Sequence, residues 1–181
     1  MLENGYTLSA DGRQYTIIEQ IGRGANTVAY LAECSHGELV TKCILKEYAP
    51  HNCIASNTDD FEGGKARFLA AGNTQNAMRQ KSVLNNQTPP VSHVFEANGT
   101  AFIDVSCYNG TTLDKLSELT LPQYMAICET IAKAVGYYHK SGYLCLDLKP
   151  ENIFILQNDP DDTVTQLVEF IDFDSIRDIS G

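Results

Sequence analysis

The first half of the chain alternates β-type segments with short turns, and this pattern limits the folds that it can adopt. β-branched and aromatic residues fill three segments, at residues 14–21, 27–33 and 39–46, as is typical of strands. The breaks between them contain Gly22-Arg23-Gly24 and Ser35-His36-Gly37, which favour tight turns. Three strands joined in this way predict an antiparallel meander.

The pattern then changes to a helix and a hairpin. Residues 60–84 are polar and rich in alanine, and they predict a helix that Gly63, Gly64 and Gly72 weaken. Residues 91–105 alternate around Ala-Asn-Gly, where the Asn-Gly pair predicts a β-hairpin.

The second half of the chain begins with another helical pattern. Apolar residues recur at helical spacing over residues 124–138, with Thr120 as a candidate N-cap and Gly142 as the end. Two short strands follow at residues 153–156 and 163–171, separated by an acidic loop at residues 158–162.

Charge, hydropathy and cysteine content exclude several classes of function. The net charge of -10 argues against a nucleic-acid partner, because phosphate backbones attract basic surfaces. No apolar stretch approaches the roughly 20 residues of a membrane helix, and the N-terminus lacks the features of a signal peptide. We expect free thiols in a reducing cytoplasm, since no Cys-x-x-Cys pair occurs. The cysteines are Cys34, Cys43, Cys53, Cys107, Cys128 and Cys145.

Residues 147–152, Asp-Leu-Lys-Pro-Glu-Asn, are the most informative stretch for chemistry. Phosphoryl transfer explains the set: Asp147 can orient an attacking hydroxyl and accept its proton. Lys149 can stabilise the charge on the transferring phosphoryl group, and Asn152 can ligate Mg²⁺. The purely structural alternative is an Asp N-cap followed by a turn.

Three other features suit the same chemistry. Asp172 follows a predicted strand 25 residues after Asp147, where a carboxylate can bridge Mg²⁺ to phosphates. Gly22 and Gly24 can let backbone N–H groups approach phosphates, although ordinary hairpin turns use the same residues. Lys46 ends a strand, and it either extends to the surface or points inward to hold the phosphates.

Together, and in this order, these four features resemble the protein kinase family over essentially the whole chain. The matching residues are Gly22 and Gly24 of the glycine-rich loop, Lys46 of the third strand, Asp147, Lys149 and Asn152 of the catalytic loop, and Asp172 of the Asp-Phe-Gly motif. The same register implies further ATP-binding positions. These are Ile21, Ala29, Ile44, Val105 as gatekeeper, Ser106, Cys107 and Tyr108 in the hinge, and Phe154 beneath adenine.

The resemblance implies a two-lobed α+β fold with ATP between the lobes. Residues 1–105 would form a five-stranded antiparallel sheet with one helix, and residues 106–181 the first part of a helical lobe. It also implies Mg²⁺ and ATP as cofactors and a protein substrate, with Lys-Pro-Glu favouring Ser/Thr hydroxyls. A complete kinase continues beyond this point, so we expect a fragment of a longer protein, of bacterial type, rather than a minimal module. We therefore expect a serine/threonine kinase of which this chain alone is too short for full activity.

Several positions depart from the family pattern. Thr27 replaces the third loop glycine, and Ile44 replaces a small alanine, which should crowd the adenine pocket. Cys145 and Leu146 replace the His-Arg pair before the catalytic Asp, and Asp174 replaces the Gly of Asp-Phe-Gly.

The partner of Lys46 stays open in the sequence. The family pattern places Ala71 where a glutamate belongs. Glu62, Gln75 and no partner at all remain as alternatives.

Two other functions are compatible with the residues. A small-molecule kinase uses the same Asp, Asn and Asp set for phosphoryl transfer but usually lacks Lys-Pro-Glu. A pseudokinase or scaffold would explain the departures, but it has no physical need for Lys46, Asp147, Asn152 and Asp172 together.

Overall fold

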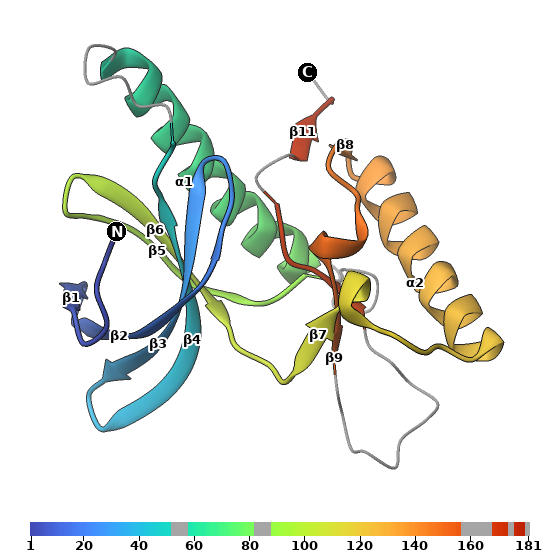
Figure 1. The fold of residues 1–181 in the computed structure, drawn as a ribbon. Coiled ribbons are helices and arrows are strands. Elements are labelled where there is room, and N and C mark those ends of the chain that lie inside the picture. The colour runs from blue at the N-terminus through green and yellow to red at the C-terminus, as the bar shows by residue number, and fades with distance from the viewer. Residues whose placement is uncertain (52–57, 82–87, 157–167, 174–175, 180–181) are drawn as a thin grey trace. The chain divides into compact units, whose positions relative to one another are not determined.

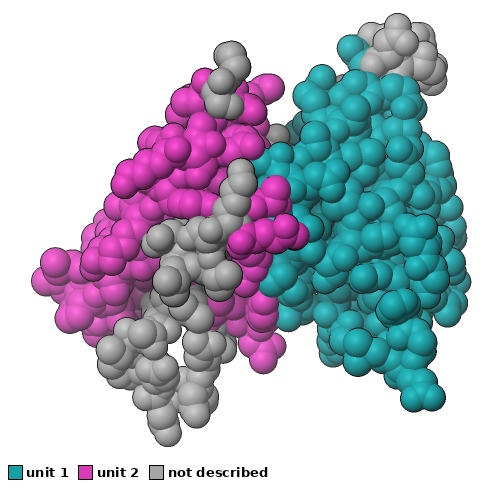
Figure 2. Space-filling view, turned by 180° about the vertical axis from the view of Figure 1, so that it is seen from behind, with its two compact units in different colours: residues 1–76, 90–107 teal, residues 77–89, 108–181 magenta. Residues whose placement is uncertain are grey.

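The computed structural model describes residues 1–51, 58–81, 88–156, 168–173 and 176–179. Two compact units emerge: unit 1 contains residues 1–76 and 90–107, and unit 2 contains residues 77–89 and 108–181 (Figure 2). Cys53, Asp174 and the predicted acidic loop lie outside the described residues.

Unit 1 is built on a six-stranded antiparallel sheet with the order β1-β2-β3-β4-β6-β5 (Figure 1). The strands are β1 (Thr7–Ala10), β2 (Arg13–Arg23), β3 (Thr27–His36), β4 (Leu39–Tyr48), β5 (Val91–Ala97) and β6 (Thr100–Ser106). The prediction of five strands is corrected by β1, which pairs with β2 at the edge of the sheet. Because β1 has four residues and buries only Leu8, its alternation is too short to recognise.

The helix α1 (Thr58–Lys81) packs on one face of this sheet, and two of its glycines permit the close approach. A Cβ atom at Gly64 would overlap the Tyr48 hydroxyl, and one at Gly72 would lie 2.8 Å from Ile103 Cδ1. Gly64 and Gly72, which weaken the helical pattern in the sequence, therefore serve packing in the fold.

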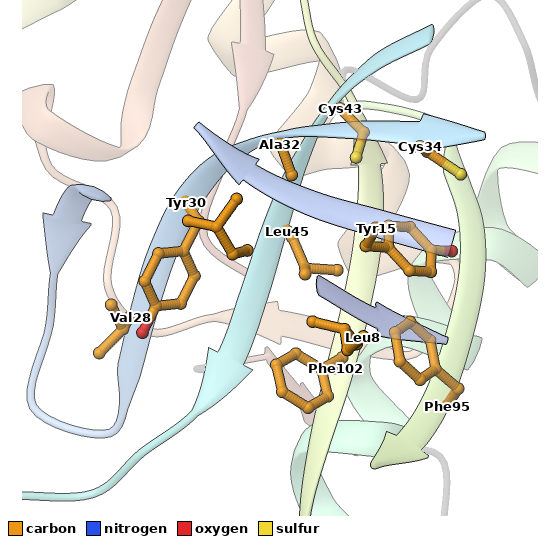
Figure 3. Close-up of a cluster of buried hydrophobic side chains, with 11 residues drawn as sticks. Leu8, Tyr15, Val28, Tyr30, Ala32, Cys34, Cys43, Leu45, Phe95 and Phe102 are labelled. Carbon is orange, nitrogen blue, oxygen red and sulfur yellow. The ribbon is translucent and has the colours of Figure 1, made fainter. Parts of the chain in front are cut away.

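The opposite face of the sheet carries a larger apolar core (Figure 3). Side chains that alternate along the strands supply it, as expected for a sheet with a buried face. Its members are Leu8, Tyr15, Ile17, Val28, Tyr30, Ala32, Cys34, Cys43, Leu45, Phe95 and Phe102.

Unit 2 combines one long helix with short strands (Figure 1). Its elements are β7 (Gly110–Thr112), η1 (Leu113–Lys115), α2 (Leu121–Lys140), β8 (Tyr143–Cys145), η2 (Pro150–Asn152), β9 (Ile153–Leu156), β10 (Val168–Phe170) and β11 (Ile176–Asp178). The sheets have the orders β10-β9-β7 and β11-β8.

The ends of α2 follow the predicted signals. Thr120 is the N-cap, and its backbone N–H donates a hydrogen bond to Gln123 Oε1 over 2.9 Å, as in a capping box. Beyond the last residue, Gly142 adopts a φ of 84°, which favours glycine. Neither of the two described α-helices has the length and apolar character of a membrane span.

The core of unit 2 lies between α2 and the β9–β10 pair. Tyr138 is fully buried and packs against Phe170 and Phe173. The last turn of α1 belongs to this unit, since Met78 joins the same cluster and its carbonyl accepts a hydrogen bond from the Tyr137 hydroxyl over 3.1 Å.

Candidate active site

The predicted catalytic loop joins β8 to β9, and a single 3₁₀ turn positions its polar side chains. Pro150 starts η2, where its fixed φ and missing N–H are tolerated. Lys149 Nζ lies 2.7 Å from Asp147 Oδ2. The amide nitrogen of Asn152 donates to Asp147 Oδ2 and to the Asp147 carbonyl, each over 3.0 Å. The loop therefore brings all three predicted residues together.

The electrostatics of this cluster keep Asp147 ionised. The hydrogen bond from Lys149 lowers the pKa of Asp147, and the bond from Asn152 lowers it further. The same contact raises the pKa of Lys149, and the charges of Asp172 and Glu151 add to the effect. Because Asn152 uses its nitrogen toward Asp147, its side-chain oxygen is left to accept or to ligate.

Strand pairing brings Asp172 to the same place. β9 and β10 are antiparallel with Ile153 opposite Phe170, and the Ile171 N–H donates to the Asn152 carbonyl over 3.0 Å. Asp172 follows directly, and it lines one pocket of unit 2 together with Asp147 and Asn152. Two carboxylates and an amide oxygen are the donors that hard cations such as Mg²⁺ prefer.

The residues next to Asp147 and Asp172 along the chain differ in how deeply they are buried. Phe173 is buried and meets the Tyr138 ring edge-on, with centroids 5.6 Å apart. Leu146 is 60% exposed. Burial raises the pKa of the Cys145 thiol to about 11, so the thiol stays protonated at neutral pH.

In unit 1, the sheet register places predicted nucleotide residues on one face. Gly22 lies opposite Ala29, Ala29 opposite Lys46, and Lys46 opposite Ile103. Directly opposed residues point to the same side of a sheet, and Ile103 packs under α1. Lys46 therefore lies on the face that α1 covers.

Ile44 and Val105 form the next row on this face, opposite each other on β4 and β6. Val105 is buried, and Ile44 packs against the apolar cluster between the sheet and α1. The branched Ile44 side chain thus occupies space beside Lys46, two residues away on the same strand.

The glycine-rich turn connects β2 to β3. The Gly24 N–H donates to the Thr27 carbonyl over 2.8 Å, and Ile21 is 50% exposed. A Cβ atom at Gly24 would lie 3.3 Å from Thr27 Oγ1. Gly24 therefore serves here by its small size, whereas a Cβ atom at Gly22 would lie 3.9 Å from Ala29 Cβ, an ordinary contact; neither glycine has a positive φ.

The predicted hinge residues lie where the chain passes from unit 1 to unit 2. Ser106 ends β6, and its N–H donates to the Pro90 carbonyl over 2.9 Å. Cys107 and Tyr108 are the last and first residues of the two units at this point. Phe154 lies on β9 in unit 2, where a Cβ atom at Gly110 would overlap its ring.

The structure narrows the alternatives for a polar residue beside Lys46. Glu62 is 60% exposed and pairs with Lys65 over 2.7 Å. Gln75 is 5% exposed and lies three residues beyond Gly72, on the sheet-facing side of α1. Gln75 is therefore better placed than Glu62 to lie beside Lys46.

Sequence reasoning missed one contribution to the glycine-rich turn. The backbone N–H groups of Ala49 and His51, just after β4, donate to the carbonyls of Asn26 and Ala25 at the tip of the turn. These bonds depend on strand pairing, so no local sequence pattern signals them.

Comparisons with known proteins agree with this fold. No protein-family model matches the chain. Serine/threonine-protein kinase PknD of Mycobacterium tuberculosis is 26% identical over 151 residues, covering 80% of this chain and 20% of the relative. Serine/threonine-protein kinase D of Synechocystis is 22% identical over 168 residues, covering 93% of this chain and 31% of the relative. The chain thus spans about a fifth to a third of the length of these relatives.

Solved structures show the same architecture. The structure of PpkA-294 in its apo form matches with a TM-score of 0.70 and 24% identity, covering 97% of this chain and 62% of that chain. A variant kinase domain of Mycobacterium tuberculosis PknI matches with a TM-score of 0.65 and 21% identity, covering 99% of this chain and 66% of that chain. The fold is that of a protein kinase domain, and the sequence is related to named serine/threonine protein kinases, which confirms the resemblance.

Proposed function

We propose that this chain binds Mg-ATP as part of a protein kinase that transfers the γ-phosphoryl group to Ser or Thr hydroxyls of proteins. The observation that supports it best is that Asp147, Asn152 and Asp172 line one pocket, and that Lys149 and Asn152 both bond to Asp147. Positioned acceptors and cations are what phosphoryl transfer requires, since the protein does little covalent chemistry.

Each residue of the cluster has a role in this proposal. Asp147 accepts a hydrogen bond from the attacking hydroxyl and orients it; its low pKa makes it a better orienting group than a strong base. Lys149 leaves Asp147 to neutralise the transferring group. Lys46, on the α1-covered face of unit 1, anchors the phosphates.

The donor set fits Mg²⁺ delivered with a nucleotide. The described residues contain no group of three or more His, Cys, Asp or Glu side chains suited to a metal ion. Magnesium is commonly held by one or two carboxylates with phosphate oxygens and water, which Asp172 and the Asn152 oxygen can supply. The ion would neutralise charge on the phosphates.

The proposal of a protein substrate draws on the relatives. Both relatives are named serine/threonine-protein kinases, and Lys149-Pro150-Glu151 is the motif that favours Ser/Thr hydroxyls. A reducing cytoplasm suits the chain, since the five described cysteines are free thiols.

Two observations favour a pseudokinase as the second candidate. Ala71 leaves α1 without a carboxylate at the family position, and Ile44 fills space beside Lys46. Nucleotide binding without transfer would be the signature of this candidate.

The first experiment is thermal unfolding with ATP, with and without Mg²⁺. A ligand at 100 times its Kd adds about 2.7 kcal/mol of stability, so the wild type should show a Mg²⁺-dependent rise in Tm. Asp172→Ala should lose the rise, and Asp114→Ala, an exposed carboxylate on η1, should keep it. A folded chain with no rise would contradict the proposal.

The second experiment measures transfer by the complete protein that contains this chain. Phosphate transfer to proteins, compared with transfer to small alcohols, separates a protein kinase from a small-molecule kinase. Asp147→Ala should abolish transfer while the Mg-ATP-dependent rise in Tm persists. Turnover retained in that variant would reject Asp147 as the orienting group.

A further inference from the structure

The segment that follows β4 holds the tip of the glycine-rich turn through its backbone. The Ala49 N–H donates to the Asn26 carbonyl over 2.8 Å, and the His51 N–H donates to the Ala25 carbonyl over 3.0 Å. Both tip carbonyls are therefore directed toward residues 49–51.

A side-chain bond adds a second tie to the same segment. Arg23 Nε donates to His51 Nε2 over 2.8 Å. A guanidinium group can only donate, so the imidazole nitrogen accepts with its lone pair. Arg23 lies between Gly22 and Gly24, so this bond holds the turn at the point where β2 enters it.

These ties set the direction of the backbone N–H groups. In a planar trans peptide the N–H points opposite to the carbonyl. Since the Ala25 carbonyl faces His51, the Asn26 N–H points away from residues 49–51. Among the described residues no backbone acceptor takes this N–H. Outward N–H groups of such a turn are the donors that bind phosphate oxygens.

We propose that residues 49–51 and the Arg23–His51 bond form a clasp, which holds the glycine-rich turn in the conformation that binds phosphate. In this clasp Arg23 and His51 are positioning residues for the triphosphate group of the nucleotide. The inference rests on the proposed function, because it requires nucleotide at this turn. Its physical basis is preorganisation: a turn that is ordered beforehand loses less entropy on binding.

Calorimetric titration of the chain with Mg-ATP and with adenosine tests the clasp. His51→Ala and Arg23→Ala should each weaken Mg-ATP binding about three- to fivefold, as expected for the modest net contribution of one hydrogen bond. Adenosine binding should not change. The double variant should match the single variants, because both remove the same bond.

Two further variants sharpen the test. His51→Gln keeps an acceptor at the same reach, so it should restore the affinity for Mg-ATP. His36→Ala, at the exposed far end of β3, is the matched control and should bind like the wild type.

The outcomes separate the clasp from the proposed function. If Arg23→Ala weakens Mg-ATP binding and His51→Ala does not, Arg23 acts by its own charge and the clasp is wrong, while nucleotide binding stands. Equal losses for Mg-ATP and adenosine would indicate general loosening and would also overturn it. A wild type that binds no Mg-ATP would remove both proposals.

Discussion

The two units differ in how completely they bury their apolar side chains. In unit 1, apolar clusters cover both faces of the sheet, and Tyr15, Tyr30 and Leu45 are fully buried. In unit 2, one side of the helix α2 is buried. Two large apolar side chains on the same helix stay exposed, Leu121 at 70% and Met125 at 62%.

The comparison indicates that unit 1 contributes mainly to stability and that unit 2 carries the polar cluster. Unit 1 has a closed core, so its side chains should contribute most to the free energy of unfolding. The polar cluster of unit 2 lies on an exposed turn, where Asp147 and Lys149 are 38% and 47% exposed. Changes there should alter chemistry far more than stability.

The largest expected effect tests this contrast directly. Leu45→Ala should lower the free energy of unfolding by about 2–5 kcal/mol, because it opens a cavity in a packed core. Leu121→Ala should change it by less than about 0.5 kcal/mol, as for most surface substitutions. Urea unfolding measures both values, and equal losses would remove the contrast.

A neighbouring pair of glycines on α1 tests the packing of helix on sheet. Gly64→Ala should destabilise the fold by about 1–3 kcal/mol, because its Cβ would overlap the Tyr48 hydroxyl. Gly63→Ala has only Arg67 Nη1 at 3.6 Å and should stabilise the helix by up to about 1 kcal/mol. Chemical unfolding of the two variants should therefore give shifts of opposite sign.

A buried carboxyl in unit 2 should make stability depend on pH. Glu169 is 6% exposed and its Oε2 has no hydrogen-bond partner among the described residues. Burial raises its pKa from 4.5 to about 6, against the opposing charge of Arg79. The folded state therefore binds more protons than the unfolded chain between these values, and stability falls as pH rises through the window.

Glu169→Gln should remove that dependence. At pH 7.5 the variant should be more stable than the wild type by up to about 2 kcal/mol, and well below pH 4.5 the difference should vanish. Denaturant unfolding at several pH values measures the difference. Glu129→Gln is the control, because the pKa of this exposed carboxyl is lowered by Lys133. A difference that is constant with pH would contradict the assignment.

The smallest expected effect concerns the catalytic loop itself. Lys149→Ala should raise the pKa of Asp147 toward its ordinary value, because the hydrogen bond from Lys149 is the main cause of the lowering. The free energy of unfolding should stay within about 0.5 kcal/mol. Carboxyl NMR titration detects the first change. Lys133→Ala, on the exposed side of α2, should leave the pKa of Asp147 where it is.

Strands in unit 1 were predictable because sheet burial imposes a period of two on the sequence. Five of the six strands and the Asn-Gly hairpin were recognised, and Asn98 and Gly99 adopt the positive φ values that this turn needs. The helix over residues 60–84 was also recognised, and it spans Thr58–Lys81. The significance of Gly64 was not predictable, since it depends on a tyrosine from a distant strand.

Local spacing by itself determined that the three polar residues of the predicted catalytic loop lie together. Asp147, Lys149 and Asn152 lie within six residues, so a single turn suffices to bring them together. The family resemblance and the α+β fold class likewise followed from the order of the motifs along the chain.

Only the tertiary structure decided the contacts between segments distant in the chain. Strand register placed Lys46 under α1 and Asp172 beside Asn152. It also joined residues 49–51 to the glycine-rich turn. The physical reason is that backbone hydrogen bonds carry no side-chain signature, whereas short-range spacing and burial period are written in the residues themselves.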